Sequence, residues 1–217
     1  MKARIKFSKT GNVKFIGHLD VMRYFQKLIR RAKLDVTYSQ GFHPHQIMSF
    51  TSPLSVGVES VGEYFDIETN LKIDPEYAVK TLNEHTVEGI EILNYIELPD
   101  DSKKSMALLA AADYSVDIQI DDETIKEFLN QDRIEVLKKT KKSENIVDIK
   151  EMIYELENRD GKLFMKLSHG SKANLKPGLV AEALCGFAGK DIPEYLNICR
   201  LEMYYEKDKK LIPLDEV

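Results

Sequence analysis

The order in which strand-like and helix-like patterns follow one another is the feature that most constrains the fold of this chain. In residues 4–9, Ile5 and Phe7 alternate with charged residues, which is the period of a half-buried strand. Residues 18–34 then carry apolar side chains at helical spacing: Leu19, Met22, Phe25, Ile29 and Ala32. We expect short strands at 35–39 and 46–50 and a longer one at 62–69, where Phe65 and Ile67 share a face. A second helix over 74–85 begins with Asp74 as N-cap and Pro75, and a strand over 88–98 follows. The pattern predicts a β-α-β-β-α-β, or split βαβ, unit.

The rest of the chain repeats this order of elements after a polar linker, residues 98–105. The expected elements are a strand at 113–120, a helix at 121–131, a strand at 133–142 that ends in a basic loop (137–142), a hairpin at 148–168, a helix at 176–186 and a strand at 195–205. Arg159-Asp160-Gly161 marks the hairpin turn, and Pro177 and Gly186 mark the ends of the last helix. We therefore predict an α+β protein of two tandem ferredoxin-like units with antiparallel sheets, in domains 1–100 and 106–217.

Composition excludes several classes of protein. No apolar run approaches the length of about 20 residues that a membrane span needs, and the charged N-terminus is unlike a signal peptide. Cys185 and Cys199 are the only cysteines, so no disulfide framework and no cysteine cluster for an iron–sulfur centre is present. No glycine-rich nucleotide-binding motif and no nucleophile elbow occurs. We expect a cytoplasmic protein with no bound cofactor or metal and no membrane partner.

Charge is distributed unevenly along the chain. Residues 1–60 carry ten Lys/Arg and three Asp/Glu, a charge of +7, which leaves −12 for the remainder of a chain whose net charge is −5. A basic segment on an acidic protein predicts a localised anionic partner. The alternative is that the two halves simply attract each other.

The first helix is expected to carry a basic stripe. Arg23, Lys27, Arg30 and Arg31 recur at spacings of three and four, so they lie beside the apolar face and could neutralise several phosphates. The alternative is an ordinary solvated helix face. Within ten residues the stripe leads into a long segment, 38–58, whose only ionisable groups other than Tyr38 are two histidines. Such a segment is either a buried crossover or the floor of a site.

The first part of that segment groups aromatic, amide and imidazole side chains around Gly41 and Pro44. These candidate binding residues are Tyr38, Gln40, Phe42, His43, His45 and Gln46. Aromatic rings stack on bases and amides bond base edges, so the set suits single-stranded RNA, and His18 at the start of the helix could join it. Three alternatives remain: a metal pair at His43 and His45, acid–base cleavage of RNA by histidines, and a structural turn. In the second half, Lys162, Phe164 and Lys166 alternate along one strand face, as on an RNA-recognition sheet.

These motifs resemble the radical-SAM-associated (radical-SAM-linked) bacterial family of uncharacterised proteins. Its pattern is a strand, an "F-x-G/S-H-L-D" helix, "Y-S-x-G-F-x-P", and then "I-S-F…P-L…G-x-E-S…E-Y-x-D". The matching positions here are Phe15, His18, Leu19, Asp20, Tyr38, Ser39, Gly41, Phe42, Pro44, Ser49, Phe50, Pro53, Leu54, Gly57, Glu59, Ser60, Glu63, Tyr64 and Asp66. His43 stands where the family often has Asn. The resemblance implies a domain that occurs fused to, or beside, radical SAM enzymes, with genes near those of ribosomal proteins and ribonucleases. The paired units also look like the architecture of CRISPR RNA-processing endonucleases, a likeness of fold alone.

We therefore expect a non-catalytic RNA-binding or adaptor protein. It would bind tRNA or rRNA and present it to, or assist, a radical SAM or RNA-modification or processing enzyme. One alternative is a metal-independent RNA endonuclease that uses His18, His43 or His45. The other is a docking module for a radical SAM protein that makes no contact with RNA.

Overall fold

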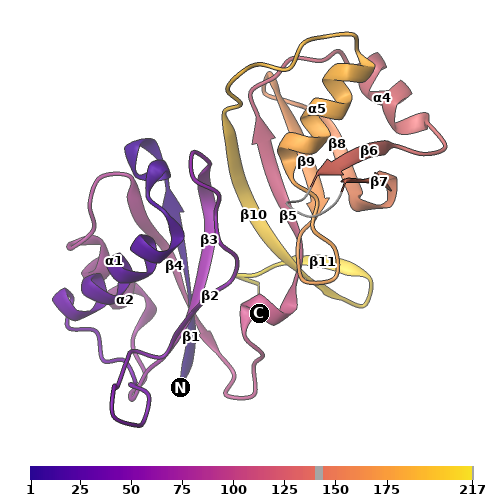
Figure 1. Ribbon diagram of the computed structural model, residues 1–217. Helices are drawn as coiled ribbons and strands as arrows, with labels where there is room; N and C mark the ends of the chain where they lie inside the picture. Colours follow the sequence, from indigo (N-terminus) through magenta and orange to yellow (C-terminus); the bar gives the residue numbers. More distant parts are fainter. Residues whose placement is uncertain (140–143, 217) are drawn as a thin grey trace.

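The computed structural model describes residues 1–139 and 144–216, and Figure 1 shows them as a mixed α and β protein. The first half contains β1 (Lys2–Lys9), the short 3-10 helix η1 (Gly11–Phe15), α1 (His18–Arg31), β2 (Met48–Phe50), β3 (Glu59–Glu68), α2 (Pro75–Asn83) and β4 (Ile90–Leu98). The second half contains α3 (Ser105–Leu108), β5 (Leu109–Val116), α4 (Asp122–Asn130), β6 (Glu135–Lys139), β7 (Glu144–Asp148), η2 (Lys150–Met152), β8 (Ile153–Arg159), β9 (Lys162–Ser168), α5 (Pro177–Phe187), β10 (Ile198–Lys207) and β11 (Lys210–Pro213).

Strands of both halves lie in one large, mostly antiparallel sheet. Among the described residues its order is β4-β1-β3-β10-β5-β9-β8, with β2 paired to β3 and β11 paired to β10. The antiparallel pairing was predicted, but the joining of the halves in one sheet was not. The junction is a short parallel contact in which Cys199 and Arg200 of β10 lie opposite Glu59 and Ser60 of β3. Gly62 allows this approach, because a Cβ there would lie 2.4 Å from the carbonyl oxygen of Leu201.

Each half has its own apolar core. In the first half, α1 and α2 cover β1, β3 and β4 (Figure 1), and the rings of Phe7, Phe25, Phe50 and Phe65 pack with centroids 4.5–6.1 Å apart. The residues that α1 buries are Val21, Phe25, Leu28 and Ile29. Leu19, predicted on this apolar face, is 66% exposed, because it lies one turn before Arg23 on the solvent side of the helix.

The ends of the second and last helices follow from local sequence signals. Asp74 caps α2 as predicted, since its Oδ1 accepts a hydrogen bond from the Tyr77 amide at 2.8 Å. In the second half α5 continues through Gly186, which was expected just past the end of the helix, and ends at Phe187. Gly189, with φ +63°, then takes the left-handed capping position that had been assigned to Gly186.

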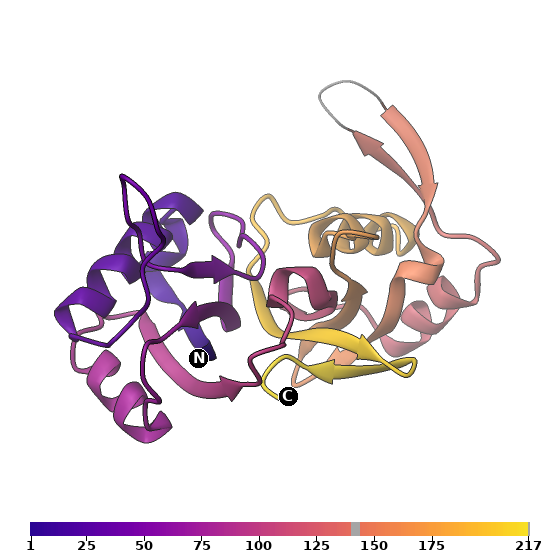
Figure 2. The same ribbon diagram turned by 90° about the horizontal axis from the view of Figure 1, so that it is seen from below.

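Two predicted strands differ in the structure. Residues 35–39 form no strand. The Thr37 amide donates to the Glu68 carbonyl oxygen, the Thr37 carbonyl oxygen accepts from the Ile47 amide, and Tyr38 makes an isolated bridge to Gln46. The strand expected at 133–142 is β6, which pairs with β7 as a separate two-stranded ribbon that projects from the body of the protein (Figure 2). The predicted basic loop, 137–142, lies partly outside the described residues. No helix in the described ranges has the length and apolar character to cross a membrane.

Candidate functional site

The basic stripe lies on the solvent side of α1, as expected. Because Val21, Phe25 and Leu28 fix the opposite side of the helix in the core, Arg23, Lys27 and Arg30 are exposed. Arg23 Nη1 lies 3.1 Å from Asp20 Oδ1, but both side chains are mostly exposed, so solvent screens this ion pair. Within the part of the chain that the structure describes, the Arg30 guanidinium donates only to the Gln26 carbonyl oxygen, at 3.1 Å. Three cations on this face are therefore available to a ligand.

The fourth member of the predicted stripe turns away from the others. Arg31 Nη2 donates to the carbonyl oxygen of His85 at 3.3 Å, and its guanidinium carbon lies 6.0 Å from the centre of the Tyr24 ring. Arg31 thus bridges α1 to the end of α2. We therefore place Arg31 at the margin of the basic face.

The candidate loop after α1 is a narrow projection with a defined base. Tyr38 and Gln46 form a bridge, and the Ser39 amide donates to the His45 carbonyl oxygen at 2.8 Å. At the tip, Gly41 has φ +115° and the Phe42 side chain is 101% exposed. Gln40, His43 and His45 are also exposed. Exposure of an apolar phenyl ring to water is unfavourable, and this ring is fully exposed. The tip of the loop therefore suits a ligand that stacks on the ring.

Gln46 does not belong to the exposed part of the loop. It is 5% exposed, and its amide nitrogen lies 3.5 Å from the Tyr38 hydroxyl, which it approaches as a donor. Its Oε1 is buried and has no hydrogen-bond partner among the described residues. The Gln46 side chain therefore packs inward at the base of the loop, and the predicted contact with RNA would require it to turn outward.

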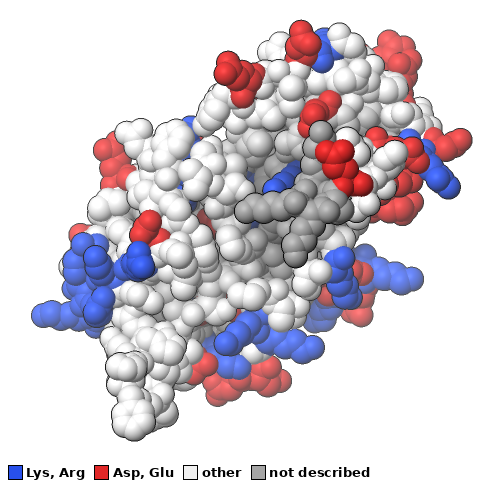
Figure 3. Space-filling view, viewed as in Figure 1, with Lys and Arg blue, Asp and Glu red and all other residues white. Residues whose placement is uncertain are grey.

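The stripe and the loop share one side of the molecule. The loop follows the C-terminal end of α1, and Figure 3 shows Lys and Arg side chains gathered over the α1 region, above an uncharged projection. His18 lies at the opposite end of this 14-residue helix, about 20 Å along its axis from the end that leads to the loop. Its ring packs edge-on against Phe50 at 5.6 Å, and burial lowers its pKa. The structure therefore separates His18 from His43 and His45.

The basic and aromatic row predicted on the second half is not an open platform. Phe164 is only 4% exposed, and the Arg159 guanidinium lies 3.4 Å from the centre of its ring. Lys166 lies 3.8 Å from Asp113 and 3.4 Å from Glu155, so its charge is compensated. Bases could not stack there without displacing Arg159, and this prediction is wrong.

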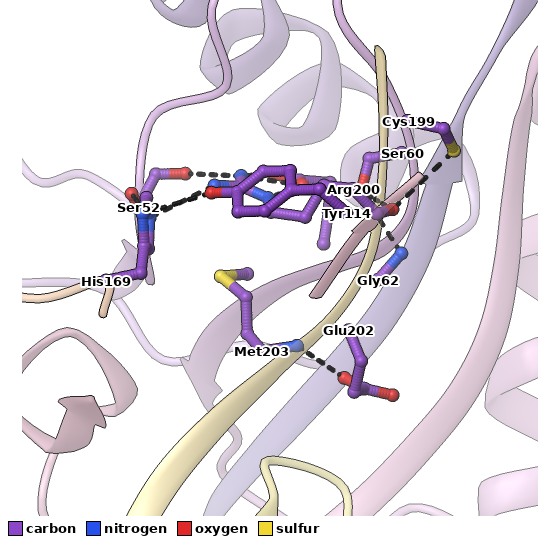
Figure 4. Close-up of polar contacts among 10 residues, drawn as sticks. Ser52, Ser60, Gly62, Tyr114, His169, Cys199, Arg200, Glu202 and Met203 are labelled. Atoms are coloured by element: carbon purple, nitrogen blue, oxygen red, sulfur yellow. Dashed lines mark hydrogen bonds and ion pairs between the residues drawn. The ribbon is translucent and has the colours of Figure 1, made fainter. Parts of the chain in front are cut away.

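Sequence reasoning missed a buried polar cluster at the junction of the two halves (Figure 4). Arg200 of β10 holds Glu63 of β3 in two hydrogen bonds, Nε to Oε1 at 2.8 Å and Nη2 to Oε2 at 2.7 Å. His169, which follows β9, lies with Nε2 3.2 Å from Arg200 Nη1 and 2.9 Å from Ser52 Oγ, and with Nδ1 3.1 Å from the Tyr114 hydroxyl. The sequence signals of this cluster were the uncharged run that contains Ser52 and the motif match at Glu63. At this point of the run Phe50 and Thr51 are buried and Ser52 is half-buried, whereas Pro53, Ser55 and Val56 are exposed.

The Ser52–His169 pair has the spacing of a nucleophile and its general base, but its electrostatics exclude that role. A guanidinium can only donate, so Arg200 occupies the lone pair of Nε2, and the ring proton resides on Nδ1 and is donated to the Tyr114 oxygen. Burial, reinforced by the Arg200 charge, lowers the pKa of His169 to about 3. A neutral imidazole whose acceptor nitrogen is engaged cannot take a proton from Ser52. The cluster is a structural joint.

Metal binding gains no support from the candidate loop. Across residues 1–139 and 144–216, no group of three or more His, Cys, Asp or Glu side chains could hold a metal ion. His45 Nδ1 is instead 2.8 Å from Ser39 Oγ, which also accepts from the His45 amide at 3.1 Å. The His45 imidazole thus stabilises the conformation of the loop through Ser39.

Comparison with known proteins places the chain in a family without assigning it an activity. No curated protein matches it. A family model described as an uncharacterised protein conserved in bacteria, DUF2344, matches residues 2–177, which span β1 through the start of α5 and include α1, the loop and most of the buried junction. The chain belongs to the DUF2344 family of bacterial proteins.

Proposed function

We propose that the protein is a non-catalytic RNA-binding protein that uses α1 and the loop 38–46 to hold a single-stranded region of tRNA or rRNA. One observation carries this proposal: three exposed cations on one face of α1 lead to a loop whose uncharged tip presents a fully exposed phenyl ring. Cations beside an exposed aromatic ring are the combination that binds the backbone and bases of a single strand. The RNA surface consists of Arg23, Lys27, Arg30, Tyr38, Gln40, Phe42 and His43, with Arg31 and His45 at its margin.

Salt dependence follows from the number of cations. Arg23, Lys27 and Arg30 would contact about three phosphates, so the logarithm of the affinity for a single strand should fall with the logarithm of the salt concentration with a slope of about −2. The tip adds stacking, which is far less sensitive to salt. The affinity at high salt therefore reflects mainly the stacking on Phe42, and the salt slope reflects the cations of α1.

The test replaces Arg23, Lys27 and Arg30 together by Glu and measures binding of a labelled single-stranded RNA by fluorescence anisotropy. We expect the affinity at low salt to fall by about a hundredfold or more and the salt slope to disappear. A matched control reverses three exposed lysines of the second half, Lys126, Lys172 and Lys207, and so changes the net charge equally. Equal losses in both triple variants would contradict a localised RNA surface.

The architecture supports a finer proposal about the fold. In the first half, β4-β1-β3 with β2 on β3 follows the chain order β-α-β-β-α-β, and in the second half β10-β5-β9-β8 has the same relative arrangement once the β6–β7 ribbon is set aside. We infer two tandem split βαβ units, joined where β10 at the edge of the second unit pairs with the first residues of β3. The proposed role as an adaptor for a radical SAM or RNA-processing enzyme is supported by the motif resemblance in residues 15–66.

A further inference from the structure

A groove on the second half lies between α5 and the strand β6 of the projecting ribbon. Its volume is about 560 Å³, and it is lined by Glu135, Val136, Leu137, Leu179, Glu182 and Ala183. Leu137 is 46% exposed, and Phe187, two turns beyond Leu179 on α5, is 42% exposed. The groove is therefore apolar along its floor, with a carboxylate on each wall. All of its lining residues belong to the described chain.

The outward face of α5 is unusual for a surface helix. Glu182 is the only charged residue among its eleven. Two rows at a spacing of four residues, Gly178–Glu182–Gly186 and Leu179–Ala183–Phe187, make up the side that is not buried. A helix face that meets only water normally carries several polar side chains, so this one is suited to contact with protein.

No close contact among the described residues requires a glycine at position 186. A Cβ at this position would meet nothing within 4 Å, so no close packing demands a glycine. Gly189 provides the C-terminal cap of the helix instead. The Gly189 amide donates to the Gly186 carbonyl oxygen at 3.2 Å, and the Lys190 amide donates to the Cys185 carbonyl oxygen at 2.9 Å. Glycine inside a helix is less favourable than alanine. Its absent side chain leaves the helix surface open to close approach from outside.

Charge indicates what kind of partner approaches. The Phe128 and Phe187 rings pack 5.6 Å apart and join α4 to α5, so the acidic residues of α4 border the same surface. Among the side chains of α4, β6 and α5 whose exposure the structure describes, the exposed acidic residues are Asp122, Glu123, Glu127, Glu135 and Glu182, against one exposed lysine, Lys126. The side chains of Lys138 and Lys139, the last two residues of β6, lie outside that description. Figure 3 shows mainly acidic side chains over this part of the molecule, whereas basic ones gather over α1. The groove lining itself carries two carboxylates, Glu135 and Glu182, and no Lys or Arg, so it would repel an RNA backbone and attract a basic protein segment.

We propose that the groove between α5 and β6 binds an amphipathic helix of a partner protein, apolar on the side that faces α5 and rich in Lys and Arg at its margins. This is the helix-in-groove mode of recognition, in which apolar side chains one turn apart enter the groove. Leu137, Leu179 and Phe187 contact the apolar side, while Glu135 and Glu182 pair with the basic margins. The site is separate from the RNA surface on α1 and does not depend on it.

The probe is a synthetic helical peptide of about 14 residues, long enough to cover the length of α5, which is about 16 Å. It is made of Leu and Lys, with Leu every three or four residues. A scrambled peptide of the same composition has no apolar face, and a Leu/Glu peptide reverses the charge. By fluorescence anisotropy with the full chain, we expect the Leu/Lys helix to bind at least about tenfold more tightly than either control. Equal binding of the scrambled peptide, or no binding of the helix, would overturn the proposal.

Gly186→Lys provides the matched variant, since it fills the open surface and adds a like charge without disturbing the fold. Its thermal midpoint should not fall, because lysine is a better helix former than glycine. We expect its affinity for the Leu/Lys helix to fall at least about tenfold, against about twofold or less for Ser171→Lys, which makes the same charge change at an exposed site outside the groove. Equal effects of the two variants would mean that general electrostatic attraction accounts for the binding, and would overturn the proposal that the peptide binds in the groove. A larger change in RNA affinity for Gly186→Lys than for Ser171→Lys would assign the surface to RNA and also overturn the proposal.

Discussion

Arg200 and Glu63 form a two-pronged ion pair across the junction of the two halves, with both hydrogen bonds between 2.7 and 2.8 Å. The two side chains are almost fully buried, at 2% and 6% exposure. The pair lies beside the short parallel contact between β3 and β10, the point at which the two halves share one sheet. Because charges so deeply buried cannot be solvated, each residue depends on the other.

Glu63→Leu should therefore destabilise the protein by about 3–5 kcal/mol, because it leaves the buried guanidinium of Arg200 without its counter-charge. The double variant Glu63→Leu/Arg200→Met removes both charges, and we expect it to recover part of this loss. Urea unfolding measures the three free energies. Asp20→Asn is the control, since it breaks the exposed pair with Arg23 and should cost about 1 kcal/mol or less. A loss for Glu63→Leu no larger than the control would show that the pair does not hold the junction.

The helices, caps and turns that depend on residues close together in the chain could be predicted from the sequence. Helical periodicity located α1, the Asp74-Pro75 pair located the start of α2, and Asp160-Gly161 located the β8–β9 turn, because caps and turns are decided within a few residues. The β3–β10 junction could not be found this way. Glu63 and Arg200 are separated by 137 residues, and nothing local to either indicates that they meet.

In the candidate site, too, the features set by local sequence could be predicted, whereas those set by contacts with distant segments could not. The exposure of Arg23 and Lys27 follows from the apolar face of their own helix, so the sequence alone was enough. The inward turn of Gln46 and the cover that Arg159 gives Phe164 depend on contacts with other segments. Residue types in the loop and on the strand were compatible with either outcome. His18 illustrates this further, since its packing against Phe50 of β2 depends on a segment 32 residues away in the sequence.

Acid should weaken the fold through His169. Its pKa in the folded protein is about 3, below the ordinary value of 6.5, so between these values the unfolded chain binds a proton that the folded chain does not. Stability from this group is thus complete above pH 6.5 and is lost as the pH falls. The expected loss between pH 6.5 and 5 is about 2 kcal/mol.

Urea unfolding at a series of pH values measures this effect. His169→Gln should be less stable than the wild type at pH 7 but should show a smaller loss on acidification, because its amide does not titrate. His18→Gln is the matched control at a histidine whose pKa is also lowered by burial, though it is less buried. An identical pH dependence of the wild type and His169→Gln would contradict a neutral, buried His169.

RNA should remain intact in the presence of the protein. Cleavage by histidines needs an acid and a base within hydrogen-bond reach of one phosphodiester. His18 lies at the other end of α1 and cannot join the two loop histidines, and His45 Nδ1 is engaged with Ser39 Oγ, which holds that ring in the geometry of the loop. Labelled single-stranded RNA incubated with the protein in EDTA and resolved on a gel should show retention without new fragments. Fragments that disappear in His18→Ala, His43→Ala or His45→Ala would establish the endonuclease alternative.

Phe42 separates stacking from charge on the proposed RNA surface. Phe42→Ala should weaken binding of single-stranded RNA by about 1–3 kcal/mol, the contribution of one stacked base, and leave the salt slope unchanged because no cation is removed. The thermal midpoint should not move, since the ring is 101% exposed and stabilises nothing within the chain. Phe42→Tyr should retain binding, and Tyr77→Ala, which removes a 59% exposed aromatic ring from α2, should leave it unaltered. If Phe42→Ala bound RNA as well as the wild type at high salt, the loop would have no part in recognition, and the basic face of α1 would act alone.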